Sequence, residues 1–214
     1  MKKMIALLLA AAFILSCVPA MALDKKVTSD LLGTSVFVPE NLELLAEFSS
    51  DDTDDIYMFF LMNDFSNLQI NSSLLYKPEY LGMQTKDVPK EDIESWKEFF
   101  TASYPKRFKS TMLRPSYGGS QRIYRFYGRN KDGNWLLSYT GVKDGLYVCT
   151  SCETGQFGFR RNEMQMIFKV FNLSFQMFAE SRGVDFVPFN PDDYEVEIFN
   201  LLYDDSPDSI FRSM

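Results

Sequence analysis

The sequence predicts an α+β fold, in which helices pack on an antiparallel β-sheet. Strand-like and helix-like segments follow the order strands, helix, strands, helix, which is typical of this class. Turn signals of the Asp-Gly and Gly-Gly kind separate the strands between residues 110 and 153, as in antiparallel meanders. The chain has 214 residues with 20 Phe and 11 Tyr, enough length and aromatic volume for one hydrophobic core.

Residues 1–22 read as an export signal. Lys2 and Lys3 precede an apolar run over residues 4–15, which is too short to span a bilayer. A small-residue cleavage site ends at Ala22. We therefore expect cleavage after Ala22 and a secreted or envelope-associated protein.

A lipoprotein signal is the alternative reading of the same segment. In that reading Cys17 would carry a lipid and become the new N-terminus. Ser16 suits such a site, but Leu15 fits it poorly. We favour cleavage after Ala22 and keep the anchor at Cys17 as the second reading.

The charge balance disfavours polyanionic partners. The formal net charge is −7, and removal of Lys2 and Lys3 leaves 20 basic and 29 acidic residues, a net charge of −9. No basic stripe is visible in the sequence, so nucleic acid and anionic membranes are not expected partners. The chain has no histidine, which removes the commonest general base and metal ligand.

A single domain is expected over residues 23–182. Residues 23–33 are interpreted as a short segment that leads into the first strand. Alternating or continuous apolar patterns then predict eight strands, at 34–39, 42–48, 56–62, 68–76, 110–117, 121–129, 134–142 and 146–153.

Two amphipathic helices complete the domain. The first begins near Pro89, presents Ile93, Trp96 and Phe100 on one face, and ends before Pro105. A basic cluster, Lys106, Arg107 and Lys109, follows its C-terminal end, where the helix dipole favours cations. The second helix is expected over residues 161–180, with an apolar face formed by Met164, Ile167, Phe168, Phe171, Phe175 and Phe178.

Residues 183–214 form an acidic, aromatic C-terminal extension. Its pattern around residues 194–203 fits a strand and a helix equally well. Two arrangements remain open, one in which the extension docks on the domain and one in which it is loose enough to bind a partner.

The order of elements resembles the PsbP-like fold. The resemblance rests on the strand segment Gly33-Thr-Ser-Val-Phe-Val-Pro-Glu40, the mid-chain helix, the meander and a closing helix with Phe171-Asn-Leu-Ser-Phe175. It covers roughly residues 34–178. It implies an α-β-α sandwich around an antiparallel sheet and, because most such proteins are non-enzymatic accessory or binding proteins, no catalytic residues to carry over.

Cys149 and Cys152 spell a C-x-x-C motif in the segment YVCTSC. The alternation through this segment predicts a strand, which would place the two thiols on opposite faces with Cα atoms about 10 Å apart. That separation exceeds the roughly 7 Å limit for a disulfide. We favour two structural cysteines over a local disulfide, which would need a bulge at Thr150-Ser151, and over catalytic redox chemistry.

Two carboxylate features have functional alternatives. The acidic run Asp51-Asp52-Thr53-Asp54-Asp55 could bind calcium, but it lacks the glycine and closing glutamate of an EF-hand loop, so a solvated turn is favoured. Glu153 or the same acidic run could serve a carboxylate-dependent hydrolase, which requires two carboxylates facing one cleft.

Two further features, a glycine-rich segment and the two tryptophans, are assigned structural roles. The segment Ser116-Tyr-Gly-Gly-Ser120 lacks the lysine of a phosphate loop and reads as a turn. Trp96 and Trp135 could line a ligand groove, but their positions favour core or half-buried packing.

The sequence thus predicts an exported, non-catalytic binding or accessory module that uses a sheet face or its C-terminal extension, with no catalytic, cofactor or metal site.

Overall fold

The structure is a computed structural model that describes residues 24–50, 53–63, 67–115 and 121–194. Its strands are β1 (Asp24–Ser29), β2 (Thr34–Pro39), β3 (Leu42–Ser49), β4 (Ile56–Met62), β5 (Leu68–Tyr76), β6 (Lys106–Leu113), β7 (Ile123–Arg129), β8 (Trp135–Lys143) and β9 (Leu146–Thr154). Its helices are α2 (Lys90–Ser103) and α3 (Arg161–Ser181), with short 3-10 turns η1 (Pro78–Tyr80), η2 (Thr85–Asp87) and η3 (Pro191–Tyr194).

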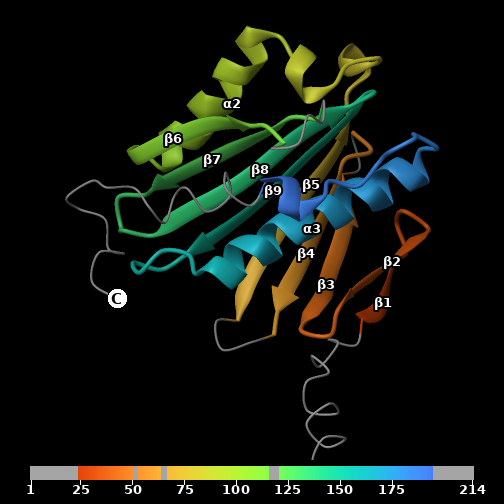
Figure 1. Cartoon of the computed structure of the whole chain (residues 1–214), viewed down its shortest axis with the longest axis horizontal. Coiled ribbons are helices and arrows are strands. Elements are labelled where there is room, and N and C mark those ends of the chain that lie inside the picture. Colours follow the sequence, from red (N-terminus) through yellow and green to blue (C-terminus); the bar gives the residue numbers. More distant parts are fainter. Residues whose placement is uncertain (1–23, 51–52, 64–66, 116–120, 195–214) are drawn as a thin grey trace, which may run out of the picture.

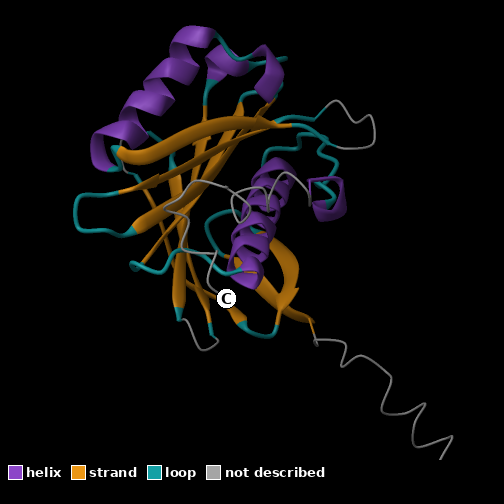
Figure 2. Cartoon of the chain, turned by 60° about the vertical axis from the view of Figure 1, so that its left-hand side comes forward, coloured by secondary structure: helices purple, strands orange, loops and turns teal. Residues whose placement is uncertain are grey.

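One antiparallel sheet organises the molecule. Strands β3 to β9 lie in the order β3-β4-β5-β9-β8-β7-β6, and α2 and α3 lie on its opposite faces (Figures 1 and 2). The hairpin connection from β8 to β9 places the end of the meander in the middle of the sheet, beside β5. The predicted α+β class, with helices packed on an antiparallel sheet, is confirmed.

Helix α3 covers the central strands with its aromatic stripe. Its main contacts are with β9, β5, β2 and β8. The predicted stripe residues are all buried, at no more than 1% exposed: Met164, Ile167, Phe168, Phe171, Phe175 and Phe178. Tyr139 of β8 meets the ring of Phe168 edge-on at 5.3 Å between centroids. This layer forms the larger of two cores.

Three buried hydroxyls lie between α3 and the sheet. Ser174 of α3 donates to Ser72 of β5 at 2.9 Å, and Ser72 shares a second hydrogen bond of 2.7 Å with Thr150 of β9. Hydroxyls buried in an apolar layer must be paired, because each unpaired group costs about 1–3 kcal/mol. The chain of three therefore favours one axial position of α3 over the sheet.

Helix α2 builds the second core on the other face. Ile93 and Phe100 are buried there, and Phe100 stacks on Phe126 of β7 at 4.7 Å. Eight of the nine residues of β8 are buried, because β8 lies under both helix layers. Strands β4, β5 and β9 instead alternate between buried and half-buried residues.

The N-terminal region departs from the expected lead. Residues 24–29 form β1, which pairs with β2 in a separate two-stranded sheet. The turn after Pro39 consequently joins strands of two different sheets, since β3 pairs with β4. The alternation of β1 is weak because its side chains are mostly exposed or half-buried, so periodicity carried little signal.

The basic cluster after α2 also differs from expectation. Lys106, Arg107 and Lys109 belong to β6, which begins at Lys106 rather than at residue 110. A bulge with a positive φ of 53° at Arg107 interrupts the register. Arg107 lies over the ring of Trp135 at 5.8 Å, so the cluster serves the sheet rather than the helix terminus.

The described part of the C-terminal extension docks on the domain. Gly183, at φ 65°, ends α3 and turns the chain back along it. Phe186 then stacks on Phe175 at 4.6 Å, and Phe189 stacks on Phe171 at 5.4 Å. Residues 195–214, including the strand-or-helix question, lie outside the described residues.

We predict that Gly141→Ala destabilises the fold. A Cβ at residue 141 would lie 3.0 Å from ring atoms of both Phe171 and Phe175, closer than the 3.4–4 Å of ordinary van der Waals contact, so the rings would have to shift. Overpacking of this kind costs about 1–3 kcal/mol. Urea denaturation measures the loss, and Gly155→Ala is the control because its Cβ would meet nothing within 4 Å. Equal stability of both variants would contradict the tight packing of α3.

Candidate functional site

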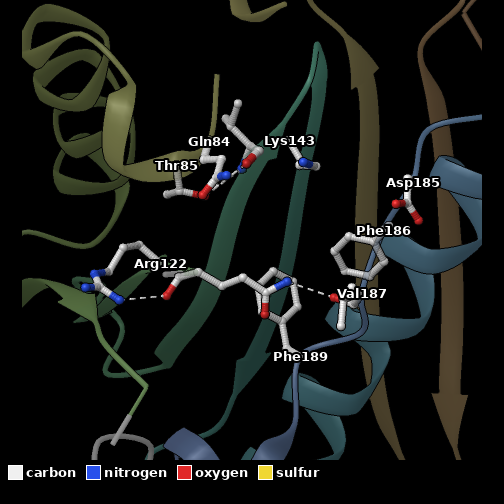
Figure 3. Close-up of a pocket in the computed structure, with 10 residues that line it drawn as sticks. Gln84, Thr85, Arg122, Lys143, Asp185, Phe186, Val187 and Phe189 are labelled. Carbon is white, nitrogen blue, oxygen red and sulfur yellow. Dashed lines mark hydrogen bonds between the residues drawn. The ribbon is translucent and has the colours of Figure 1, made fainter. Parts of the chain in front are cut away.

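A cleft of about 390 Å³ lies where the extension passes the ends of the meander strands (Figure 3). Four segments contribute to it: η2, the start of β7, the end of β8, and the chain that follows α3. Its lining residues are Gln84, Thr85, Gln121, Arg122, Val142, Lys143, Asp185, Phe186, Val187 and Phe189.

The wall formed by η2 is held to β8 through Thr85. The Thr85 hydroxyl accepts from the Val142 amide at 2.9 Å and donates to the Val142 carbonyl at 3.3 Å. Gln84 forms a bridge with Lys143 that extends the edge of the sheet by one pair. This wall is therefore fixed by backbone pairing and a buried hydroxyl.

The opposite wall is held by two side-chain amides. Asn172 of α3 donates to the Phe189 carbonyl and accepts from the Phe189 amide, each at 2.9 Å. Gln121 donates to the Val187 carbonyl at 2.8 Å, which ties the extension to the start of β7 (Figure 3). Because both walls are tied to regular elements, the cleft is preformed, and a preformed site avoids the cost of ordering loops on binding.

The chemistry of the lining is amphipathic and mildly basic. Two aromatic rings and two valines supply apolar surface, and two glutamines supply amide groups. Arg122 and Lys143 bring two positive charges against one carboxylate, that of Asp185. Apolar clefts with a few convergent polar groups are the usual form of small-molecule sites. An excess of cations favours a ligand that carries an anionic group.

The two cysteines lie on opposite faces of β9, as predicted. Cys152 belongs to the core under α3, while Cys149 packs against the core under α2. Both thiols are free. Burial raises the pKa of Cys149, and burial together with the charges of Glu163 and Glu153 raises the pKa of Cys152. Raised pKa values disfavour the reactive thiolate.

Glu153 links two elements instead of facing a cleft. One carboxylate oxygen accepts from the Tyr104 hydroxyl at the end of α2, and the other accepts from the Asn134 amide at 2.9 Å. Burial and this hydrogen bond raise the pKa of Tyr104, so the phenol stays protonated as the donor. Glu153 is not among the residues that line the cleft.

The acidic run separates β3 from β4 in the sequence. Asp51 and Asp52 fall outside the described residues, and Thr53 donates to Asp55 at 2.7 Å. Within the described ranges, no group of three His, Cys, Asp or Glu side chains is placed to hold a metal ion. The glycine-rich segment 116–120 also falls outside the described residues.

Neither tryptophan lines the cleft. Trp135 is 3% exposed and stacks on Tyr127 at 4.9 Å, while Arg129 lies over its ring. Trp96 is half-buried on α2 and contacts Tyr124 and Tyr147 edge-on. Core and half-buried packing is therefore confirmed for both.

A second surface lies on the half of the sheet that α2 leaves open. Phe48 of β3 is 49% exposed and stacks on Tyr57 at 5.1 Å and on Phe59 at 5.5 Å. The cleft residues and this aromatic row were not singled out by the sequence. The alternation of β4 was the available signal for Tyr57 and Phe59, whereas the cleft had no local signal because its segments are distant in the chain.

Comparison with solved structures gives matches to chains of similar element order. The solution structure of cyanobacterial PsbP from Synechocystis aligns with 77% of this chain and 94% of its own, at 12% identity and a TM-score of 0.36. This likeness agrees with the expected PsbP-like resemblance at the level of the element pattern, and neither family membership nor a residue role follows from it. Comparisons with protein-family models and with curated proteins give no match.

Among the residues that the structure describes, neither α2 nor α3 has the length and apolar character that a membrane-spanning helix requires.

We predict that both thiols are present and protected in the folded protein. Iodoacetamide at pH 8 should modify neither Cys149 nor Cys152 appreciably in the native state, because Cys152 is buried, Cys149 is half-buried, and both pKa values are raised. Denaturation without reductant should make both reactive, as peptide mapping by mass spectrometry can show. A native peptide that lacks two hydrogens would instead reveal a disulfide and contradict the opposed arrangement.

We predict that calcium leaves the stability unchanged. A ligand that binds only the folded state raises the melting temperature, by an amount that grows with the ratio of its concentration to its dissociation constant. The melting temperature in millimolar CaCl₂ should therefore equal that in MgCl₂ and in EDTA. A calcium-specific increase that disappears in Asp54→Asn/Asp55→Asn would establish a site at the β3–β4 turn.

Proposed function

We propose that this protein is an exported, non-catalytic binding module that holds a small amphipathic anion in the cleft beside η2. The carrying observation is a preformed cleft of about 390 Å³ that combines aromatic rings with Arg122 and Lys143. The export signal over residues 1–22 supports the localisation. Among the lining residues one is a carboxylate, Asp185, whereas a carboxylate-dependent hydrolase needs two in one cleft.

The apolar residues and the cationic residues of the lining would bind different parts of the ligand. The rings of Phe186 and Phe189 offer apolar area, and removing apolar area from water contributes about 25 cal/mol per Å². The cations would select an anionic end group, since a like-charged ligand would be repelled. The ligand class expected is an aryl or alkyl carboxylate, sulfonate or phosphate small enough for the cleft.

Anilinonaphthalene sulfonate is a suitable probe because it joins an apolar aryl body to one anionic group. We predict saturable binding at one site, measured by its fluorescence. Lys143→Glu should weaken binding about tenfold, equivalent to about 1.4 kcal/mol, and Val187→Asp should act in the same direction. N-phenylnaphthylamine, which lacks the sulfonate, should bind more weakly and respond little to Lys143→Glu.

Matched controls lie outside the cleft. Lys131→Glu makes the same charge change in the β7–β8 turn, and Phe157→Asp places an acid at a side chain that is 89% exposed. Both should leave probe affinity unchanged. Equal effects of cleft and control variants would show binding elsewhere on the molecule and refute the proposal.

A further inference from the structure

The wall of the cleft that the chain after α3 forms exposes apolar side chains to solvent. Val187 is 70% exposed, and its neighbour Phe186 is half-buried. Single exposed apolar residues are common on protein surfaces and need no explanation. These two, however, line a preformed cleft of about 390 Å³, so they offer apolar surface to whatever occupies it.

The opposite wall of the cleft carries a lysine that can take an acidic partner. Lys143, the last residue of β8, and Val187 belong to opposite walls (Figure 3). Among the residues that the structure describes, the Lys143 ammonium forms no ion pair. It can therefore bind the acidic end of an occupant whose apolar part covers the exposed valine.

The last described residues of the chain lie next to this cleft. Phe189 lines the cleft, and Tyr194 follows it by five residues. The Tyr194 hydroxyl donates to the carbonyl of Gln121, another lining residue, at 3.3 Å. Residues 195–214 therefore leave from a point beside the cleft. A chain of that length reaches up to about 66 Å when extended at 3.3 Å per residue, so length does not limit its return to the cleft.

One stretch of the extension has the chemistry expected of a cleft ligand. Within residues 195–214, the stretch Leu202-Tyr203-Asp204-Asp205 places an apolar and an aromatic side chain directly before two carboxylates. This is the combination of an aryl body and an anionic group. The later apolar pair Ile210-Phe211 is instead followed by Arg212, which Lys143 would repel. The order of the charges therefore favours residues 202–205 as the occupant.

We propose that residues 202–205 occupy the cleft as an intramolecular ligand, with a carboxylate on Lys143 and the Tyr203 ring against the exposed apolar wall. The inference rests on the proposed function, because it assigns an internal competitor to the same cleft. An external anion binds only when the extension leaves. The extension thereby sets the ligand concentration at which the protein becomes occupied.

The covalent connection makes even a weak contact effective. A short flexible connection gives an effective concentration on the order of 1 mM. A stretch that alone bound the cleft with a Kd of about 0.1 mM would then fill about nine-tenths of the clefts. The apparent Kd of an external ligand would rise about tenfold, because affinity falls with the fraction of protein that is open to binding.

Probe titration of the full chain tests this competition. Anilinonaphthalene sulfonate should bind about tenfold more tightly to Y203S/D204N/D205N than to the unaltered protein, because these substitutions remove the internal competitor. The matched control E195Q/E197Q/F199S removes one ring and two acids from the same extension and should leave the affinity unchanged. In the Lys143→Glu background the gain should fall below about twofold, since that change already releases the extension.

Carbodiimide coupling locates the contact without the probe. The reagent activates a carboxylate, which a lysine amine then attacks, so an amide bond forms and the carbodiimide leaves as a urea that carries the lost oxygen. We expect a link between Lys143 and Asp204 or Asp205, detected by mass spectrometry of peptides from the monomer. Lys143→Arg keeps the charge and should abolish the link, whereas Lys131→Arg should not alter it.

The outcomes separate this inference from the proposed function. Probe binding that depends on Lys143 but ignores Y203S/D204N/D205N, with no link to Lys143, would overturn the inference and leave the proposed function intact. Probe binding that Lys143→Glu does not weaken even in Y203S/D204N/D205N would refute the proposed function, while a link in the monomer would still establish the docking. A link found only at the mass of a dimer would refute intramolecular binding.

Discussion

The contact between the aromatic stripe of α3 and the central strands supports the remainder of the structure. Phe171 and Phe175 press against β8 at Gly141, where a Cβ would come within 3.0 Å of both rings. Each fully buried phenylalanine contributes about 1.5–3 kcal/mol, and favourable ring pairs add about 0.5–1.5 kcal/mol. The same helix holds the returning chain alongside it, because Phe186 stacks on Phe175 and Phe189 stacks on Phe171. The described start of the C-terminal extension is consequently held against α3.

The two helix layers cover opposite faces of the sheet and so determine which core each strand residue joins. A strand covered on both faces assigns neighbouring side chains to different cores, so Cys149 and Cys152 belong to different cores despite a spacing of three. In this chain the C-x-x-C spacing therefore reflects the packing of one cysteine into each core. Where no helix covers one face of a strand, the side chains on that face point towards solvent. The aromatic row at Phe48 and Tyr57 is an example.

The candidate binding cleft is a composite of distant segments. The cleft joins η2, β7, β8 and the chain after α3, and its walls are held by Thr85, Asn172 and Gln121. The cleft depends on one feature, the return of the chain along α3 to Tyr194, which places the described part of the extension beside the residues that precede β7.

Periodicity and turn chemistry within the sequence determined the α+β class, the two helices, most of the meander and the opposed cysteines, because each depends on residues close together in the chain. The weakly patterned β1 and the early start of β6 were missed, since exposed strands and bulges leave little periodic signal. Only the tertiary structure decided which strands pair and where the cleft opens. These features arise from contacts between residues far apart in sequence, which local patterns do not encode.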